Sequence, residues 1–332
     1  MFRFGVLGVS HFAVRKMIPA MQRGDGVAVV AIASRERGRA EEAARELGIA
    51  RAYGSYEELL ADPAVDAIYN PLPNHLHVSW SERAAAAGKH VLCEKPLGCD
   101  AAEARRLLAA RDRHRVLISE AAMVRLHPRW LAVRELLRAG RIGRLRSFVG
   151  TFAYRLTDRS NVRYDRTMGG GVLLDTGFYP VTMSRFCFEA EPVRVAARLD
   201  RDPETGVDLL SSAILDFGHG HAIFTCGMEL APGQRAQLHG TAGHLELREA
   251  WNPHPEHPSE LLLETSPTLE RPATERLTFP AVDQYTLLAE AFARAAAGGG
   301  PAPLPLEDAV ANMAVLDALA RAAESGGWEA PG

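Results

Sequence analysis

The feature that most constrains the fold of this chain is a regular alternation of strands and helices over its first third. Short apolar runs predict strands at Phe2–Val9, Val27–Ala33, Ala67–Tyr69, His90–Cys93 and Val116–Ser119. Helical spacing lies between them, at Phe12–Arg23, Glu36–Leu47, Tyr56–Ala61, Val78–Ala87 and Ala101–Arg113. Parallel strands need such crossovers, which place helices on both faces of the sheet. The sequence therefore predicts an α/β fold that begins with a doubly wound parallel sheet.

The second half of the chain is rich in predicted strands. A helix at Pro128–Ala139 leads into β-type runs bounded by Gly, Pro and Asp turns: Leu145–Tyr154, Val193–Asp200, Leu209–Asp216, His221–Met228, Ala236–Gly240 and His244–Arg248. Two helices, Gln284–Ala297 and Leu306–Glu324, flank a Gly- and Pro-rich loop at the end. A length of 332 residues suits two domains, and we predict them at residues 1–120 and 121–332.

The first turn carries a nucleotide-binding signal. Gly5-Val-Leu-Gly8-Val-Ser10 joins the first strand to the first helix. Gly8 lets a phosphate approach the backbone, and the N–H groups and dipole of a helix start favour an anion. Two glycines at this spacing are a weak pattern alone, but their place between a strand and a helix predicts a dinucleotide site.

The end of the second strand discriminates between two cofactors. Enzymes that prefer NAD usually place an acidic residue there to hold the ribose, whereas this strand ends Ala33-Ser34-Arg35. A hydroxyl and a guanidinium suit the 2′-phosphate of NADP. We therefore predict NADP(H) over NAD(H). In the alternative interpretation Arg35 is solvated at a helix start, and Glu36 reaches the ribose.

Polar residues also follow the third and fourth strands. The loop Asn70-Pro-Leu-Pro-Asn74-His75-Leu-His77 is stiffened by prolines, and Glu94-Lys95-Pro96 ends the strand at His90–Cys93. Ligands of open parallel sheets bind at such strand ends, and Pro96 restricts the direction of Lys95. The alternative is an ordinary solvated Glu-Lys pair. His75 and His77 have no cysteine or carboxylate neighbours in the sequence, so we predict no metal site.

Composition excludes several classes of function. The formal net charge is -3 and no basic run is present, which argues against nucleic acid as a partner. No apolar run is long enough to span a membrane. The four cysteines are scattered, which argues against zinc and suits a reducing cytoplasm. Because Phe2–Val9 already reads as a strand, we expect no signal peptide and a cytoplasmic location.

The second half contains one chemically distinctive stretch, Met168-Gly-Gly-Gly-Val-Leu-Leu-Asp175-Thr-Gly-Phe-Tyr179-Pro180. The three glycines allow the backbone to approach a neighbour or a ligand closely. If the helical path includes Asp175, then Asp175 and Tyr179 lie one turn apart on the same face. In the alternative interpretation Asp175 caps a helix and Tyr179 packs in the core.

These motifs, in this order and spacing, resemble the Gfo/Idh/MocA oxidoreductase family over nearly the whole chain. The chain is most similar to the branch of glucose-fructose oxidoreductase, dimeric dihydrodiol dehydrogenase, NADP-dependent xylose dehydrogenase and sugar ketoreductases, since Tyr179 stands where other branches carry His. The resemblance implies an NADP(H)-binding Rossmann domain at 1–120, and a substrate-binding and oligomerisation domain at 121–332 built on a large open, mostly antiparallel sheet. Two departures are Ser10 in place of a third glycine and the Pro- and His-rich segment 251–258.

The resemblance also implies a sugar-like substrate and an acid/base role for Tyr179. A neighbouring Lys95 ammonium would lower the pKa of the phenol from its ordinary value near ~10. Asp175 would orient the substrate or pair with Lys95. The predicted catalytic residues are Lys95, Tyr179 and Asp175; weaker substrate candidates are His127, Arg163 and Asp165. The predicted cofactor contacts are Gly8, Ser10, His11, Phe12, Ser34, Arg35, Asn70, Leu72, Asn74, His75, Glu94, Lys95, Pro96 and Glu120.

Two other functions stay open at this point. A non-catalytic NADP(H)-binding regulator would use the same first half without a Lys-Asp-Tyr set, and a metal-dependent hydrolase would use the histidine-rich loops. Because an open sheet leaves one face uncovered, we also expect a homodimer or homotetramer formed through that face.

Overall fold

A computed structural model describes residues 1–265 and 273–332, which form two compact units. The first contains Met1–Leu126 and Asp283–Met313, and the second contains His127–Val282 and Ala314–Gly332. This division differs from a single boundary at residue 120, because the segment 283–313 returns to the first unit. There, Thr286 Oγ1 donates to the Ala20 carbonyl at 2.9 Å. Arg23 and Asp283 form an ion pair at 2.6 Å.

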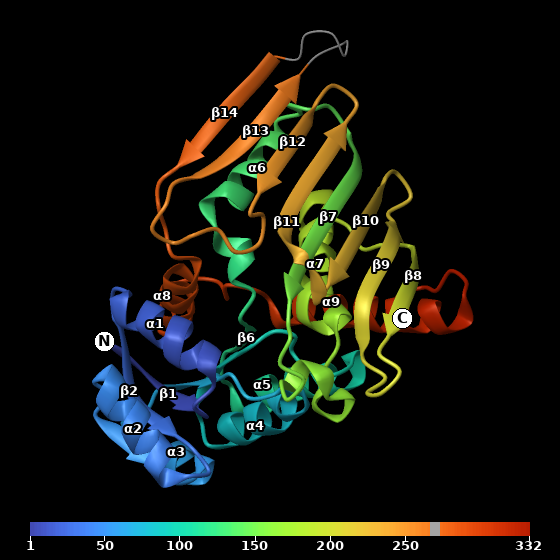
Figure 1. Ribbon diagram of the computed structural model, residues 1–332. Helices are drawn as coiled ribbons and strands as arrows, with labels where there is room; N and C mark the ends of the chain where they lie inside the picture. The colour runs from blue at the N-terminus through green and yellow to red at the C-terminus, as the bar shows by residue number, and fades with distance from the viewer. Residues whose placement is uncertain (266–272) are drawn as a thin grey trace. The chain divides into compact units, whose positions relative to one another are not determined.

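The first unit is built on a six-stranded parallel sheet with the order β3-β2-β1-β4-β5-β6. Figure 1 labels β1, β2 and β6 of this sheet. This order confirms the predicted doubly wound fold, and its switch point lies between β1 and β4. The elements are β1 (Phe2–Leu7), η1 (Ala13–Met17), α1 (Ile18–Arg23), β2 (Val27–Ala33), α2 (Arg37–Leu47), β3 (Arg51–Tyr53), α3 (Tyr56–Leu60), β4 (Ala67–Asn70), α4 (Asn74–Ala86), β5 (His90–Cys93), α5 (Ala101–His114), β6 (Ile118–Glu120), η2 (Met123–Leu126) and α8 (Gln284–Ala296).

Short-range signals explain where these elements begin. Ser55 caps α3 by accepting from the Glu58 N–H at 3.1 Å, and Asp100 caps α5 by accepting from the Glu103 N–H at 2.7 Å. Gly5 lets Leu59 pack closely on β1, because a Cβ there would lie 2.7 Å from Leu59 Cδ2.

The second unit is built on an eight-stranded sheet with the order β14-β13-β12-β11-β7-β10-β9-β8. Neighbouring strands are antiparallel except β7 and β10, which confirms the predicted large, mostly antiparallel sheet. The elements are α6 (Pro128–Arg138), β7 (Leu145–Arg155), η3 (Val162–Tyr164), η4 (Arg166–Met168), η5 (Leu173–Gly177), α7 (Phe178–Phe188), β8 (Arg194–Arg201), β9 (Asp208–Asp216), β10 (His221–Gly227), β11 (Glu229–Gly240), β12 (His244–Arg248), β13 (Ser259–Thr265) and β14 (Ala273–Phe279). A last helix, α9 (Leu306–Ser325), begins in the first unit and ends in the second.

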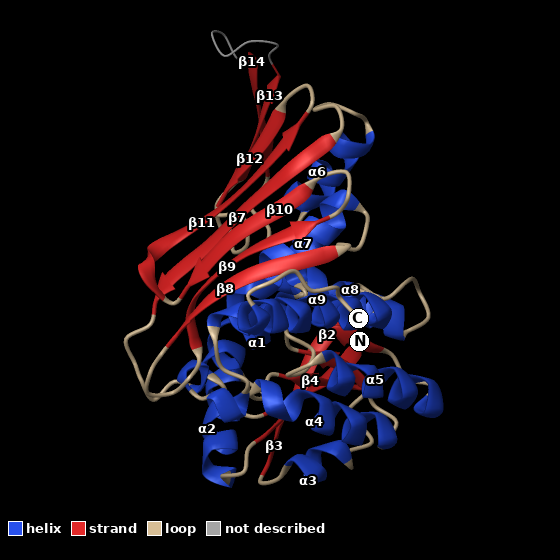
Figure 2. Ribbon diagram, turned by 90° about the vertical axis from the view of Figure 1, so that its right-hand side faces the viewer, coloured by secondary structure: helices blue, strands red, loops and turns tan. Residues whose placement is uncertain are grey.

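The two faces of this sheet differ. One face packs against α6 and α7 and buries Phe148, Phe224 and Leu238, and Figure 2 shows both helices along it. On the other face, Val149, Ile223 and Ile214 are aligned across β7, β10 and β9 by strand register. Ile223 and Ile214 are 37% and 41% exposed. No helix of the second unit, as far as the structure describes it, covers this face.

Six of the eight strands coincide with predicted ones, and β13 and β14 do not. β14 is exposed along most of its length and carries no hydrophobic alternation, as is usual for an edge strand. β11 begins at Glu229 rather than at the predicted Ala236. The Pro232-Gly233 pair reads as a turn but lies at a register shift between β11 and β7.

A buried arginine fixes the connection between β12 and β13. Arg129 is 1% exposed, and its guanidinium donates to the carbonyls of Arg248 and Glu249, both at 2.8 Å. Burial lowers the pKa of Arg129 to about 10, which still leaves it charged at neutral pH. Trp130 Nε1 donates to the Ala250 carbonyl at 2.8 Å. These bonds anchor the start of the Pro- and His-rich segment 251–258 to α6.

None of the helices that the structure describes combines the length and the apolar character of a membrane-spanning segment.

Candidate active site

The turn between β1 and the first helix has the geometry of a phosphate-binding loop. Gly8 has a φ of 81°, and a Cβ there would lie 3.0 Å from Leu72 Cδ2. Ser10, at the third-glycine position, accepts from the Ala13 N–H at 3.1 Å and so stabilises the start of the helix. The helical path already includes His11 and Phe12. Five predicted cofactor residues therefore meet at this turn: Gly8, Ser10, His11, Phe12 and Leu72.

The end of β2 lies beside the glycine turn, because the Gly8 N–H donates to the Ala33 carbonyl at 2.8 Å. Ser34 is buried and accepts from the Glu36 N–H at 3.2 Å, whereas Arg35 is exposed. Burial raises the pKa of Tyr56, and the positive charges of Arg35 and Arg39 oppose that rise. Two guanidinium groups therefore lie near the Tyr56 hydroxyl, which is 3.6 Å from the Cβ position of Gly8.

The loop after β4 is held by its own side chains. Asn70 is fully buried; its amide donates to the His77 carbonyl at 3.0 Å and to Ser81 Oγ at 3.1 Å. Its carbonyl oxygen accepts from the Leu72 N–H at 3.3 Å. The Asn70 side chain is thus used within the loop, and its backbone carbonyl accepts from the Glu94 N–H at 3.0 Å, so Asn70 joins this loop to the Lys95 loop.

Two histidines of this loop behave differently. The ring nitrogens of His77 lie 2.6 Å and 2.7 Å from the carbonyl oxygens of Leu72 and Pro96, and burial lowers its pKa to about 4. His77 therefore ties this loop to the Lys95 loop. His75 Nδ1 is buried without a hydrogen-bond partner within the described residues. A buried polar atom of this kind is available to a ligand.

The loop after β5 holds Lys95 at the carboxyl edge of the sheet. Glu94 accepts from the Tyr69 hydroxyl at 2.8 Å and from the Lys95 N–H at 3.3 Å. Glu120, fully buried at the end of β6, accepts from the Leu97 N–H at 2.8 Å. Two predicted cofactor residues, Glu94 and Glu120, therefore also fix the backbone on either side of Pro96.

Together, these residues of the first unit fit a dinucleotide. The glycine turn opens onto a helix start, two guanidinium groups lie at its edge, and His75 has an unsatisfied buried nitrogen. All of them belong to the carboxyl edge of one parallel sheet.

In the second unit, Gly170 and Gly171 leave room for neighbouring protein atoms. A Cβ on Gly170 would lie 2.5 Å from the Arg163 carbonyl oxygen, and one on Gly171 would lie 2.1 Å from Asp208 Oδ1. Asp208 also accepts from the Leu173 N–H at 2.6 Å, so Asp208 fixes the start of the following helical path. The close approach that the sequence predicts is therefore an approach to neighbouring protein atoms.

Asp175 lies inside this helical path, in the π-helical turn η5 that runs directly into α7. Its carboxylate pairs with Arg163 through Nε–Oδ2 at 2.7 Å and Nη2–Oδ1 at 3.1 Å. The Tyr154 hydroxyl donates to Asp175 Oδ2 at 2.7 Å. Burial, followed by the Asp175 charge, raises the pKa of Tyr154 well above its ordinary value, so Tyr154 stays a neutral donor.

Tyr179 lies on α7 and is 5% exposed. Its ring packs against Phe152 at a centroid distance of 5.3 Å and against Trp251 at 6.2 Å. Trp251 is fully buried and donates from Nε1 to the Thr151 carbonyl at 2.8 Å. The segment 251–258, which matches no motif, therefore supplies an aromatic wall beside Tyr179.

The remaining substrate candidates have structural partners. His127 is 2% exposed and caps α6, because its Nδ1 accepts from the Arg129 N–H at 3.1 Å. Asp165 caps η4 by accepting from the Thr167 N–H at 2.8 Å. Polar residues directly before helices commonly act in this way.

The predicted site residues thus fall into two groups, each held within its own unit. The first unit brings together the cofactor candidates and Lys95; the second brings together Asp175, Arg163 and Tyr179, to which Tyr154 and Trp251 are added. No sequence signal identifies Tyr154, which lies within an ordinary strand. The described residues contain no group of three or more His, Cys, Asp or Glu side chains suited to a metal ion.

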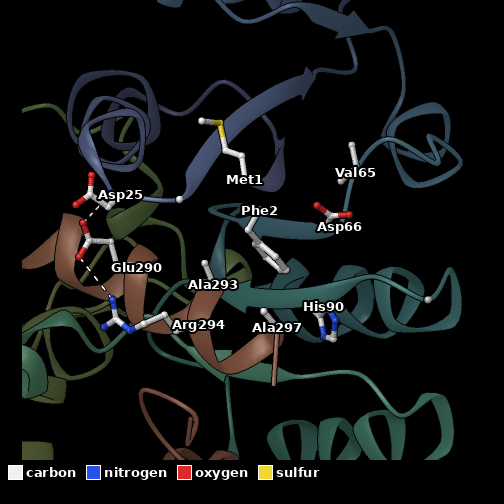
Figure 3. A pocket seen from close by; sticks show the side chains of 12 residues that line it. Met1, Phe2, Asp25, Val65, Asp66, His90, Glu290, Ala293, Arg294 and Ala297 are labelled. Carbon is white, nitrogen blue, oxygen red and sulfur yellow. Dashed lines mark hydrogen bonds and ion pairs between the residues drawn. The ribbon is translucent and has the colours of Figure 1, made fainter. Parts of the chain in front are cut away.

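A hollow of about 630 Å³ in the first unit lies away from this chemistry. It is lined near the amino ends of the strands by Phe2, Asp66 and His90, together with Glu290 of α8 (Figure 3). Asp66 is already paired with Arg3 at 2.6 Å, and Glu290 accepts from the Asp25 N–H at 2.8 Å. None of the predicted site residues lines this hollow.

Comparison with known proteins assigns both parts of the chain. Residues 2–121 match the Gfo/Idh/MocA model described as an oxidoreductase family with an NAD-binding Rossmann fold. Residues 130–246 match the model of the Gfo/Idh/MocA C-terminal domain.

Three relatives align over nearly the full length. An uncharacterized oxidoreductase of Rhizobium meliloti is 44% identical and covers 98% of both chains. A D-xylose 1-dehydrogenase (NADP+) of Haloferax volcanii is 39% identical over 97% of this chain and 98% of its own. The crystal structure of a 3-ketoreductase from Actinomadura kijaniata in complex with NADP and TDP-benzene superposes with a TM-score of 0.90, at 32% identity and 97% coverage of each chain.

The buried cap His127 leads to a pH-dependent prediction. Burial lowers its pKa to about 4, whereas an unfolded His titrates near ~6.5. Between these values only the unfolded chain binds the proton, so the stability associated with neutral His127 is complete above pH ~6.5 and is lost as the pH falls towards 4. His127→Asn keeps an acceptor for the cap and cannot titrate. It should reduce the acid-induced loss of unfolding free energy by up to about 3 kcal/mol.

Urea unfolding of both proteins between about pH 7 and 4.5 measures this difference. The matched control is His257→Asn, since His257 is exposed, and it should follow the wild-type curve. The account of His127 is wrong if His127→Asn and wild type lose stability in parallel.

Proposed function

Because the chain belongs to the Gfo/Idh/MocA oxidoreductase family, we propose that it transfers a hydride between NADP(H) and a sugar, keto-sugar or related polyol or diol. The observation that carries this proposal is the convergence of the glycine turn, Ser34-Arg35 and the Lys95 loop at one edge of the parallel sheet. The NADP in the solved 3-ketoreductase and the sugar substrate of the xylose dehydrogenase support it.

Different residues of the first unit would bind different parts of the cofactor. Gly8, Ser10 and the helix start would hold the diphosphate, and Ser34 with Arg35 would hold the 2′-phosphate. The loops of Asn74-His75 and Glu94-Lys95-Pro96 would hold the nicotinamide side. When bound, the cofactor supplies or accepts a hydride at C4 of the nicotinamide. We assign cofactor binding to residues 1–120, and substrate binding and assembly to residues 121–332.

The chain supplies the proton that accompanies the hydride. The oxygen on the reacting carbon gains a proton on reduction and loses one on oxidation, and Tyr179 is the acid/base that we assign to this step. The aromatic contacts with Phe152 and Trp251 orient its ring. The Lys95 ammonium favours the phenolate and so brings the phenol towards a working pKa.

Cofactor preference tests the assignment of Arg35. Arg35→Ala should weaken NADPH binding by roughly 10- to 100-fold, because a charge-assisted hydrogen bond contributes about 1.5–3 kcal/mol. NADH binding should be nearly unchanged, and fluorescence titration measures both. Arg37→Ala is the matched control, since Arg37 already pairs with Glu58 at 3.0 Å. A wild-type preference for NADH would refute the assignment.

Substitution of the acid/base pair tests the mechanism. Tyr179→Phe should lower turnover by roughly 100-fold or more, the usual contribution of a positioned acid/base, with little change in NADPH affinity. Lys95→Ala should be at least as harmful, since it removes the charge that activates the phenol. Tyr53→Phe is the control and should retain turnover. It removes a hydroxyl on β3 that donates a hydrogen bond to Asp62.

The outcomes separate three roles. If Lys95 is the direct proton donor, Lys95→Ala abolishes turnover while Tyr179→Phe keeps most of it. If Tyr179 is only a core residue, Tyr179→Phe lowers the melting temperature and leaves turnover intact. Full turnover in both variants would eliminate this site.

The open face of the eight-stranded sheet is the assembly surface that we propose. Val149, Ile223 and Ile214 form an apolar row across three strands, and a face of this kind is rarely left in water. A homodimer or homotetramer that pairs two such faces would bury the row.

Light scattering at micromolar concentration tests this assembly. The wild type should be a dimer or tetramer, and Ile223→Lys should shift it towards the monomer because a charge would be buried in the interface. Leu131→Lys is the matched control, since Leu131 is 38% exposed on α6, away from this face. A monomeric wild type would contradict the assembly.

A further inference from the structure

An ion pair, rather than a lone carboxylate, lies next to Tyr179 in the second unit. Asp175 is one turn before Tyr179, and Arg163 grips both of its oxygens, at 2.7 Å and 3.1 Å. The Asp175 side chain is 14% exposed and that of Arg163 is 40% exposed. The Asp175 charge raises the pKa of Arg163, with smaller contributions in the same direction from Tyr154 and Tyr179. Arg163 and Tyr179 therefore lie within electrostatic range of each other.

The fold builds this pair into a fixed position. The Arg163 carbonyl accepts from the Gly171 N–H at 3.0 Å, and only a glycine at position 170 leaves room for it. Asn161 accepts from the Arg163 N–H at 3.1 Å at the start of η3. The glycine-rich turn thus holds the backbone of Arg163 against the helical path that carries Asp175 and Tyr179.

The sign of each charge matters for the chemistry of a phenol. A carboxylate one turn away disfavours the phenolate and raises the pKa of Tyr179, whereas a guanidinium favours the phenolate and lowers it. Asp175 alone would therefore oppose the acid/base role that the proposed function gives to Tyr179. The paired Arg163 offsets that effect.

We propose that Arg163 is the positioning residue that compensates Asp175, so that the pair rather than Asp175 alone sets the acidity of Tyr179. This proposal rests on the proposed function, and it changes the role of Asp175. The carboxylate holds Arg163 in place and accepts from Tyr154, and it acts on the reaction through Tyr179 instead of by orienting the substrate.

The other groups of the second unit named here are neutral or already engaged elsewhere. From β7, Tyr154 is kept neutral by burial and by Asp175. From β9, Asp208 is engaged by the Leu173 N–H and by Ser211 Oγ at 2.7 Å. From β10, burial raises the pKa of the Cys226 thiol to about 12, so it is neutral. Phe152 and Trp251 are uncharged, and Arg134 of α6 lies over Phe186.

A titration of Tyr179 itself tests the proposal without any substrate. Tyrosine Cζ is labelled with ¹³C in the full-length protein, and the Tyr179 resonance is identified by its loss in Tyr179→Phe. Arg163→Gln should raise the pKa of Tyr179 by about one pH unit, and Asp175→Asn should lower it by a similar amount. The double variant Arg163→Gln/Asp175→Asn should return close to wild type, because it removes both charges. Arg163→Lys, which keeps the charge, should shift less than Arg163→Gln.

The pH profile of kcat/KM for oxidation should move with the same signs. No shift, shifts of the same sign in the two single variants, or a double variant far from wild type would overturn the proposal. If Arg163→Gln does not fold, the same titration of Asp175→Asn tests the proposal. A lowered pKa of Tyr179 in that variant supports the proposal, and an unchanged or raised pKa refutes it. A folded protein that turns over no sugar or diol would instead refute the proposed function, and the titration would still report on the ion pair.

Discussion

The alignment of the carboxyl ends of parallel strands is the constraint on which the cofactor side of this molecule depends. Right-handed helical crossovers require every strand of the six-stranded sheet to end at the same edge, so loops distant in sequence become neighbours. Hydrogen bonds then join neighbouring loops. They link Gly8 to Ala33, His77 to Leu72 and Pro96, and Leu97 to Glu120. The residues after Lys95 are consequently tied on both sides, Pro96 to the loop after β4 and Leu97 to the end of β6.

The second unit poses a different physical problem, because the phenol of Tyr179 lies inside an aromatic core. Tyr179 is almost fully buried on a helix whose every residue is buried, and its neighbours are aromatic. Burial alone would raise the pKa of such a phenol. Under the proposed function, the Asp175–Arg163 ion pair held by the glycine turn therefore matters as much as the phenol itself. The buried Arg129 contributes indirectly, by anchoring the segment that presents Trp251.

Much of the first unit is predictable from sequence because its signals are local. Adjacent residues alone reveal the hydrophobic periodicity of the strands and helices and the glycines of the first turn. They also show that Arg35 stands where an acidic residue would favour NAD. The second unit is less predictable because its site depends on partners far apart in sequence: Tyr154 is 21 positions from Asp175, and nothing in a strand pattern reveals which side chain faces a carboxylate. Two of the predicted substrate residues, His127 and Asp165, lie directly before helices and also act as caps. The return of segment 283–313 to the first unit is also a long-range packing event without a local signal.

The central claim is that this chain moves a hydride directly between a nicotinamide and a carbon of a sugar-like substrate. The most direct measurement uses NADPH that carries deuterium at C4, with the enzyme and a panel of keto-sugars, and locates the deuterium in the product by NMR and mass spectrometry. The account predicts that one face of C4 delivers its deuterium to the carbon that becomes the carbinol. Oxidation of NADPH without deuterium in the sugar, or no reaction with any member of the panel, would contradict it.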